Sequence, residues 1–158
     1  MAIEIRKAEL NDIDLLMKWR MKVLHEVFSI PDGQTTEELE QANRLYYQSA
    51  LPAGGHIACF AYKENEVVGC GGICLYQEMP SPDNISGQCA YLMNIYTCPQ
   101  FRGNGIGELI VKWLVGQAVQ RNITKIYLET SKPGRKLYTK TGFLDMPDMM
   151  MLQHIERL

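Results

Sequence analysis

A glycine-rich hexapeptide between a strand-like run and a helical pattern constrains this chain more than any other feature. Residues 102–107 read Arg-Gly-Asn-Gly-Ile-Gly. The preceding run, residues 90–97, is β-branched and aromatic and stops before Pro99, and the apolar residues from 109 to 114 then follow with helical spacing. A strand that turns through glycines into a helix presents unpaired backbone N–H groups and the positive end of the helix dipole. The segment therefore predicts a loop that binds a phosphate or pyrophosphate, beside the positive charge of Arg102.

Three kinds of phosphate-binding loop can be compared with these residues. A nucleoside-triphosphate loop needs a lysine followed by Ser or Thr after the glycines, and this sequence has none there. A dinucleotide fingerprint needs a third glycine, and Glu108 occupies that position; Glu129 does lie at about the distance expected of a ribose-binding acid, so a dinucleotide-binding oxidoreductase stays an alternative. The pattern R-x-x-G-x-G fits without a mismatch.

A second motif lies downstream, where residues 137–143 read Leu-Tyr-Thr-Lys-Thr-Gly-Phe. Together the two motifs resemble the GCN5-related N-acetyltransferase (GNAT) superfamily, in which R-x-x-G-x-G binds the pyrophosphate of acetyl-coenzyme A and L-Y-x-x-x-G-F follows the fifth strand. That strand corresponds here to residues 125–130, and a short helix begins near Pro133. The apolar residues 149–153 resemble the last strand of the family. The resemblance covers most of the chain and is strongest from Gln88 onward.

Local patterns predict the order of the elements. They indicate a strand at 3–6, a helix from Asn11 or Asp12 to about Val27, a helix that begins at 35–38, a loop at 52–55, strands at 56–63 and 66–76 joined through Glu64 and Asn65, and a loop at 77–87. The resemblance implies an α/β (α+β) fold, the GNAT fold: a mixed, mostly antiparallel twisted sheet of about six to seven strands, in the order β-α-α-β-β-β-α-β-α-β-β, with helices on both faces. We expect a single domain over residues 1–158.

The resemblance also implies where the cosubstrate lies. The pantetheine arm is expected along the strand that ends near Thr97, where two strands splay apart, with the Ile95 N–H as an oxyanion donor. Tyr138 is expected to protonate the departing thiolate, and Ser131 takes a position where the family often has an asparagine that contacts pantetheine. The expected cofactor-binding residues are Asn94, Ile95, Tyr96, Thr97, Arg102, Gly103, Asn104, Gly105, Ile106, Gly107, Ser131 and Tyr138.

Acetyl transfer to an amine also needs a base, because an alkyl amine with a pKa of ~10.4 is mostly protonated at pH 7. Glu129, at the end of its predicted strand, is the leading candidate. Glu26, His25 and Glu78 remain alternatives, and Glu26 and Glu78 are also candidate substrate contacts. Arg20 on the first predicted helix is a candidate partner for a substrate carboxylate.

The composition limits the remaining function classes. The chain has 158 residues, a hydrophobic content of 46% and a net charge of −2, which is typical of a soluble domain and gives no reason to expect a nucleic-acid or membrane partner. Five cysteines without a C-x-x-C pair, and a start without a secretory pattern, indicate the cytoplasm. We expect an acetyl-CoA-dependent N-acetyltransferase without a metal, acting on a small-molecule amine rather than a peptide amine. A non-catalytic acyl-CoA sensor is the alternative, and a homodimer is suggested by the resemblance alone.

Overall fold

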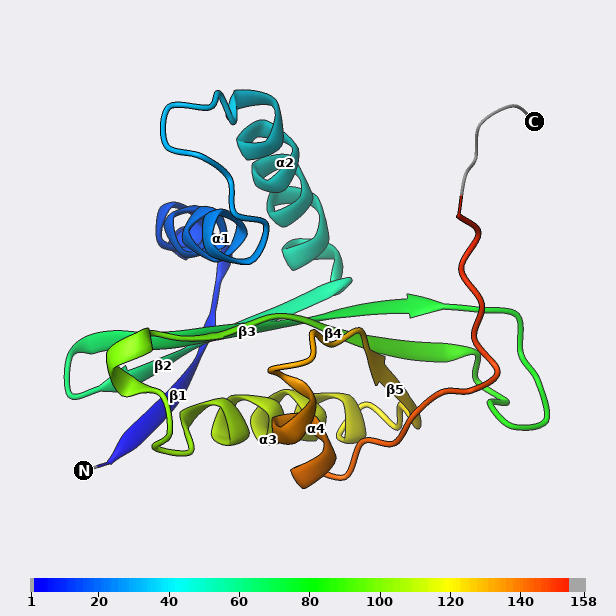
Figure 1. The fold of residues 1–158 in the computed structure, drawn as a ribbon. Helices are drawn as coiled ribbons and strands as arrows, with labels where there is room; N and C mark the ends of the chain where they lie inside the picture. The colour runs from blue at the N-terminus through cyan, green and yellow to red at the C-terminus, as the bar shows by residue number, and fades with distance from the viewer. Residues whose placement is uncertain (1, 154–158) are drawn as a thin grey trace.

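The computed structural model describes residues 2–153, which form a five-stranded sheet with two helices on each face (Figure 1). The strands are β1 (Ile3–Ala8), β2 (His56–Lys63), β3 (Glu66–Gln77), β4 (Gln88–Thr97) and β5 (Lys125–Leu128). The helices are α1 (Ile13–Val27), α2 (Glu37–Ala53), α3 (Ile106–Val119) and α4 (Arg135–Lys140), with short 3-10 turns η1 (Leu10–Asp12) and η2 (Pro99–Phe101). Neighbouring strands lie in sequence order, and every pair is antiparallel except β4 with β5.

The predicted order is confirmed as far as α4, and the mixed, mostly antiparallel sheet is confirmed with it. The predicted number of strands is wrong, since the described residues form five strands rather than six to seven. The expected last strand at 149–153 pairs with no strand: Met150 is 98% exposed and Met151 is 76% exposed. After a turn at residues 147–148 this segment, the red trace in Figure 1, runs past the end of the sheet without a strand partner among the described residues. The apolar side chains of residues 149–153 were therefore not enough to make this segment a strand, because no sheet edge in the described chain pairs with it.

Smaller differences concern element ends. Helix α2 includes the first two residues of the predicted loop at 52–55 and ends at Ala53. Gly54 then caps it in the left-handed conformation. Strand β5 ends at Leu128, two residues earlier than predicted. Leu109, the first of the helically spaced apolar residues after the glycine loop, is 43% exposed. No helix within residues 2–153 is long and apolar enough to cross a bilayer.

Two apolar layers hold the helices on the sheet. Helix α3 buries Ile110 and Leu114 against Ile73 and Leu92 of the central strands. On the other face, α1 and α2 bury Trp19 and Tyr47 against Phe60 and Tyr96. Figure 1 shows the same division, with α1 and α2 on one side of the sheet and α3 and α4 on the other.

Gly71 of β3 lets α3 lie unusually close to the sheet. A Cβ at this position would lie 2.5 Å from Cγ2 of Ile110 and 3.0 Å from Cδ1 of Ile95. Real Cβ atoms do not approach neighbours that closely, so any larger residue at 71 would push α3 or β4 away. The absent side chain thus fixes the distance between α3 and the end of β4, where the candidate site lies.

Candidate active site

A β-bulge interrupts strand β4 at Asn94 and Ile95. Cys70 of β3 pairs with Tyr96 and Gly72 pairs with Met93, so both bulge residues oppose Gly71 alone. Asn94 has a φ of 60°, a left-handed conformation that asparagine tolerates better than most residues. The bulge aims the Asn94 side chain toward α1, where its Oδ1 accepts a hydrogen bond from Arg20, whereas Ile95 faces α3.

Strands β4 and β5 part just before this bulge. Only Cys89 to Leu92 of β4 pair with β5, so within the described residues 2–153 no strand lies beside residues 93–97 on that edge. A strand edge with unpaired backbone groups is ready to bind an extended ligand that supplies the missing amides. Residues 94–97, expected to hold pantetheine, all lie on this free edge.

The glycine loop follows β4 directly and leads into α3. Gly105 is the N-cap of α3 with a φ of 78°, and no side chain caps the helix. A Cβ on Gly103 or Gly105 would meet nothing within 4 Å, so the space outside the loop is open. Asn104 closes the loop by donating from Nδ2 to the carbonyls of Phe101 and Arg102. An uncapped helix start next to open space fits the pyrophosphate that the sequence predicted.

Arg102 connects the glycine loop to α1. Its Nε donates to the Thr97 carbonyl at 2.9 Å, and its Nη2 donates to Glu26 Oε1 at 2.5 Å. The other oxygen of Glu26 accepts a hydrogen bond from the Tyr96 hydroxyl at 2.6 Å. Hydrogen bonds from Arg102 and then from Tyr96 lower the pKa of the Glu26 carboxyl. Glu26 is thus a partner of the loop arginine and is held ionised, which makes it a poor proton acceptor.

Glu108, which occupies the position of the third glycine in a dinucleotide loop, ties α3 to α4. Its carboxylate accepts hydrogen bonds or ion-pair contacts from Lys112 at 2.7 Å and Lys140 at 2.5 Å. These two lysines lower the pKa of Glu108 to about 2. The contact positions α4, and with it Tyr138, next to the start of α3.

Tyr138 lies half-buried on α4 with its ring edge-on to Phe143, at a centroid distance of 5.9 Å. Among residues 2–153 no partner hydrogen-bonds its hydroxyl. Burial raises the pKa of Tyr138, so the hydroxyl keeps its proton at neutral pH. A Cβ built on Gly107 would lie 3.1 Å from Cδ2 of Leu137, the neighbour of Tyr138, and 3.8 Å from Oγ1 of Thr97. The loop, the free end of β4 and α4 therefore meet at one place.

Glu129 lies directly after β5 on the same side as Tyr138. Both residues line an open cavity of about 1050 Å³ between β5, α4 and the segment that follows α4. Tyr91 of β4 is close to each of them: burial and then the Glu129 carboxylate raise the pKa of Tyr91, and Tyr91 in turn adds to the raised pKa of Tyr138. The two predicted catalytic residues thus line one cavity, and Tyr91, whose pKa the Glu129 carboxylate raises, was not among the residues predicted from the sequence.

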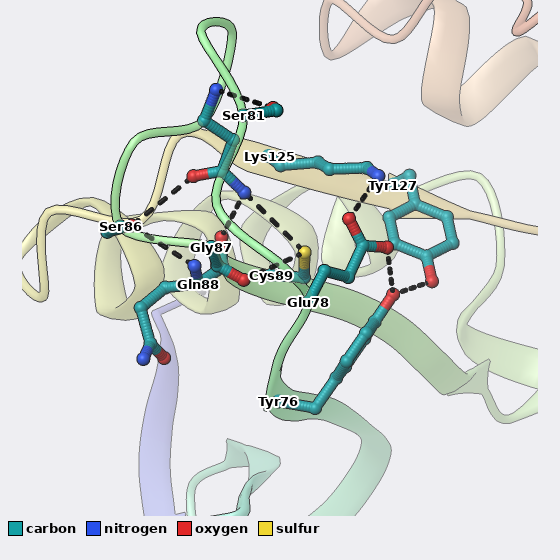
Figure 2. Close-up of polar contacts among 10 residues, drawn as sticks. Tyr76, Glu78, Ser81, Ser86, Gly87, Gln88, Cys89, Lys125 and Tyr127 are labelled. Carbon is teal, nitrogen blue, oxygen red and sulfur yellow. Dashed lines mark hydrogen bonds and ion pairs between the residues drawn. The ribbon is translucent and has the colours of Figure 1, made fainter.

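One predicted residue lies away from this place, whereas Ser131 lies near Tyr138, since a Cβ built on Gly134 would be 3.5 Å from Ser131 Oγ and 3.4 Å from Tyr138 Cε2. Glu78 pairs with Lys125 at 2.7 Å, beside the hydrogen-bonded Tyr76 and Tyr127, at the other end of β4 (Figure 2). From Cys89, at that end, to Asn94 the strand spans about 17 Å. Ser131 is exposed, and its Oγ accepts a hydrogen bond from the Gly134 N–H at 3.4 Å, so it orders the turn before α4.

His56, a buried polar residue on the α1 and α2 side of the sheet, was also not among the site residues predicted from the sequence. His56 of β2 is 5% exposed, and its Nδ1 lies 2.9 Å from the hydroxyl of Tyr46, which also contacts Cys74. Burial, followed by the charge of Arg20, lowers the pKa of His56 to about 4. The turn at Glu64 and Asn65 would place His56 opposite residue 73. A bulge in the hairpin shifts its partner to Cys74, so only an approximate pairing was predictable.

Comparison with known proteins agrees with this geometry. Residues 19–143 match the model of the acetyltransferase (GNAT) family. A crystal structure of a predicted acetyltransferase with acetyl-CoA from Clostridium acetobutylicum is 31% identical, with a TM-score of 0.86 over 99% of each chain. A GCN5-related N-acetyltransferase from Ralstonia eutropha is 20% identical, with a TM-score of 0.81 over 96% of this chain and 99% of that one.

Glucosamine-6-phosphate N-acetyltransferase from Arabidopsis thaliana is 18% identical, with a TM-score of 0.70 over 99% of this chain and 100% of that one, which shows a shared fold. No curated protein sequence matches the chain. Within residues 2–153, no group of three or more His, Cys, Asp or Glu side chains is arranged to hold a metal ion.

Proposed function

The chain belongs to the acetyltransferase (GNAT) family and is an acetyl-CoA-dependent N-acetyltransferase, and from this premise we propose that it acetylates a primary amine of a small molecule by direct attack within a ternary complex. One observation carries the proposal: the free edge of β4, its bulge and the uncapped start of α3 are contiguous. This arrangement supports simultaneous binding of an extended acyl carrier and its pyrophosphate, with the α1 side of the bulge left for an acceptor.

Each part of this surface has a binding role in the proposal. The N–H groups at the start of α3 and the loop at Gly103 and Gly105 hold the pyrophosphate of acetyl-CoA. Backbone groups of residues 93–97 pair with the pantetheine amides as an added strand would. Acetyl-CoA supplies an activated thioester. The Ile95 N–H donates to its carbonyl oxygen as negative charge develops there, a contribution of about 3 kcal/mol for such a donor.

Proton movements are assigned to two side chains. Glu129, exposed at the end of β5, accepts the proton that the acceptor amine must lose. Tyr138, protonated at neutral pH and without a hydrogen-bond partner in the described chain, donates to the sulfur as the thiol leaves. The raised pKa of Tyr138 supports this role, because a hydroxyl that keeps its proton can deliver it.

Isothermal titration with acetyl-CoA tests the proposal first. The native chain should bind, and Gly105→Glu should abolish binding because it places a carboxylate at the pyrophosphate position. Gly116→Glu is the matched control, since it adds the same charge to the same helix at a position with nothing within 4 Å. Thermal unfolding of each variant checks that it folds.

Thiol release with a panel of amines then separates catalysis from sensing. Turnover with any primary amine supports the enzyme mechanism above. Tight binding of acetyl-CoA without thiol release for every amine would favour the sensor, and absence of binding by the native chain would overturn the assignment of all these residues.

A further inference from the structure

Arg20 of α1 is a half-buried cation held by two neutral amides. Its Nε donates to Oδ1 of Asn43 on α2 at 2.9 Å, and its Nη1 donates to Oδ1 of Asn94 at 3.0 Å. A guanidinium has five N–H groups in a planar fork. These two bonds use one N–H of Nε and one of Nη1, so three N–H groups on Nη1 and Nη2 have no partner within residues 2–153. The amides fix the orientation of the fork and leave its outer side unused.

No carboxylate in the described part of the chain lies within 4.0 Å of Arg20. Four other arginines, Arg6, Arg44, Arg102 and Arg135, each pair with an Asp or Glu side chain. Arg121 also has no carboxylate partner in the described chain, but it is exposed to solvent and its side chain bonds only to Gln117 of α3, whereas Arg20 is half-buried. The charge of Arg20 acts on the pKa of five nearby groups that are neutral at pH 7, namely Tyr46, Tyr47, His56, Cys70 and Cys74. A partly desolvated charge without a counter-ion is costly, so a site of this kind is suited to receive an anion.

The position of Arg20 connects it to the proposed reaction. Its partner Asn94 is the bulge residue directly before Ile95, the proposed oxyanion donor. Arg20 reaches the bulge from α1 and also contacts α2 through Asn43. These two helices lie on one face of the sheet and α3 lies on the other (Figure 1). An acceptor that enters from the α1 side therefore meets Arg20 next to the place of transfer.

We propose that the acceptor amine also carries a carboxylate, and that Arg20, oriented by Asn43 and Asn94, binds this carboxylate. The substrate class is then an amino acid or a similar small zwitterion. The adjacent N–H groups of Nη1 and Nη2 match the two oxygens of a carboxylate, which favours this group over a bulkier anion. The inference rests on the proposed function, because it names the acceptor of the same site.

The test uses acceptor sets that share one amine. An α-amino acid is compared with its amide, with the corresponding decarboxylated amine and with O-phosphoethanolamine, at saturating acetyl-CoA, with thiol release as the readout. We expect kcat/KM for the amino acid to exceed that for its amide by about 10-fold to 100-fold, the range for a charged hydrogen-bonded pair. In Arg20→Gln this advantage should vanish through a raised KM for the amino acid, with the amide nearly unaffected.

Controls separate this inference from the proposed function. Arg44→Gln, which removes an exposed arginine of α2 paired with Asp14, should keep the preference. Arg20→Lys, which keeps the charge but not the fork, should keep part of it, and this variant also serves if Arg20→Gln does not fold. If the amide and the decarboxylated amine are turned over as well as the amino acid or better, this inference is wrong but the proposed function stands. If only O-phosphoethanolamine is turned over, the inference is also wrong, because Arg20 then binds a phosphate and not a carboxylate. No turnover of any amine overturns the proposed function and this inference together.

Discussion

Glu26 of α1 and Arg102 of the glycine loop are joined at 2.5 Å, so a helix near the start of the chain holds the loop that precedes α3. The two residues are 76 positions apart. Arg102 also bonds to the end of β4 through the Thr97 carbonyl. Arg102 therefore connects α1, the end of β4 and the glycine loop. Its predicted contact with a phosphate would be made while these two hydrogen bonds hold its side chain in place.

Arg102→Gln should weaken acetyl-CoA binding about 10-fold, which corresponds to about 1.4 kcal/mol, because it removes a charge beside the proposed pyrophosphate. Isothermal titration at two salt concentrations measures the effect, which should shrink at high salt. Arg6→Gln is the matched control: Arg6 has a similar exposure and also pairs with a glutamate, but it lies on β1. Equal affinities for the two variants would show that Arg102 only supports the loop.

Tyr138→Phe should lower kcat about 100-fold, within the range for loss of a general acid, while the Kd for acetyl-CoA changes little. The reason is that the hydroxyl, not the ring, supplies the proton, and the ring contact with Phe143 is kept. Steady-state kinetics across pH measure this. A variant with nearly full turnover and an unchanged pH profile would remove Tyr138 from the mechanism, and Tyr62→Phe on β2 is the control.

Glu129→Gln should flatten the rise of turnover with pH, since the amide cannot accept a proton from the acceptor amine. The expected loss of kcat/KM at neutral pH is about 100-fold. Glu66→Gln, an exposed acid at the start of β3, is the control. If the pH profile of Glu129→Gln matches that of the native chain, another group or water takes the proton.

Gly71→Ala should lower the free energy of unfolding by about 1–3 kcal/mol, the usual cost of overpacking, because its Cβ would lie 2.5 Å from Ile110. Gly116→Ala in α3 is the opposite case. Its Cβ meets nothing within 4 Å, so the better helix propensity of alanine should stabilise the protein by up to about 1 kcal/mol. Urea unfolding of both variants tests the pair, and equal effects would contradict the close approach of α3 to β3.

His56 should make stability depend on pH in a defined window. Its pKa is about 4 in the folded protein, against 6.5 for an unperturbed histidine, so only the unfolded chain takes up its proton as pH falls from about 6.5. Stability should therefore decrease between about pH 6.5 and pH 4, by about 3 kcal/mol for this residue. His56→Asn should remove that slope, whereas His25→Asn should retain it. Urea unfolding at a series of pH values measures both, and an unchanged slope in His56→Asn would contradict the burial of a neutral imidazole.

The sequence by itself determined the order of elements as far as α4 and the glycine loop between β4 and α3, while Tyr138 was singled out by the family resemblance of its motif. The order and the loop depend on local chemistry: glycines permit the left-handed turn at Gly105, and apolar spacing marks the helix that follows. The same local information predicted a last strand at 149–153 that the structure does not pair. A strand needs a partner edge, and apolar periodicity does not say which edge is available.

Tertiary structure decided the bulge at Asn94, the parting of β4 from β5 and the meeting of Arg20 with Asn94, which are 74 residues apart. It also decided that Glu26 pairs with Arg102 and that Glu78 lies at the far end of β4. The physical reason is that register, close approach and ion pairing depend on which distant residues share a position in space. No residue type carries that information alone, and packing around Gly71 and the bulge fixes it.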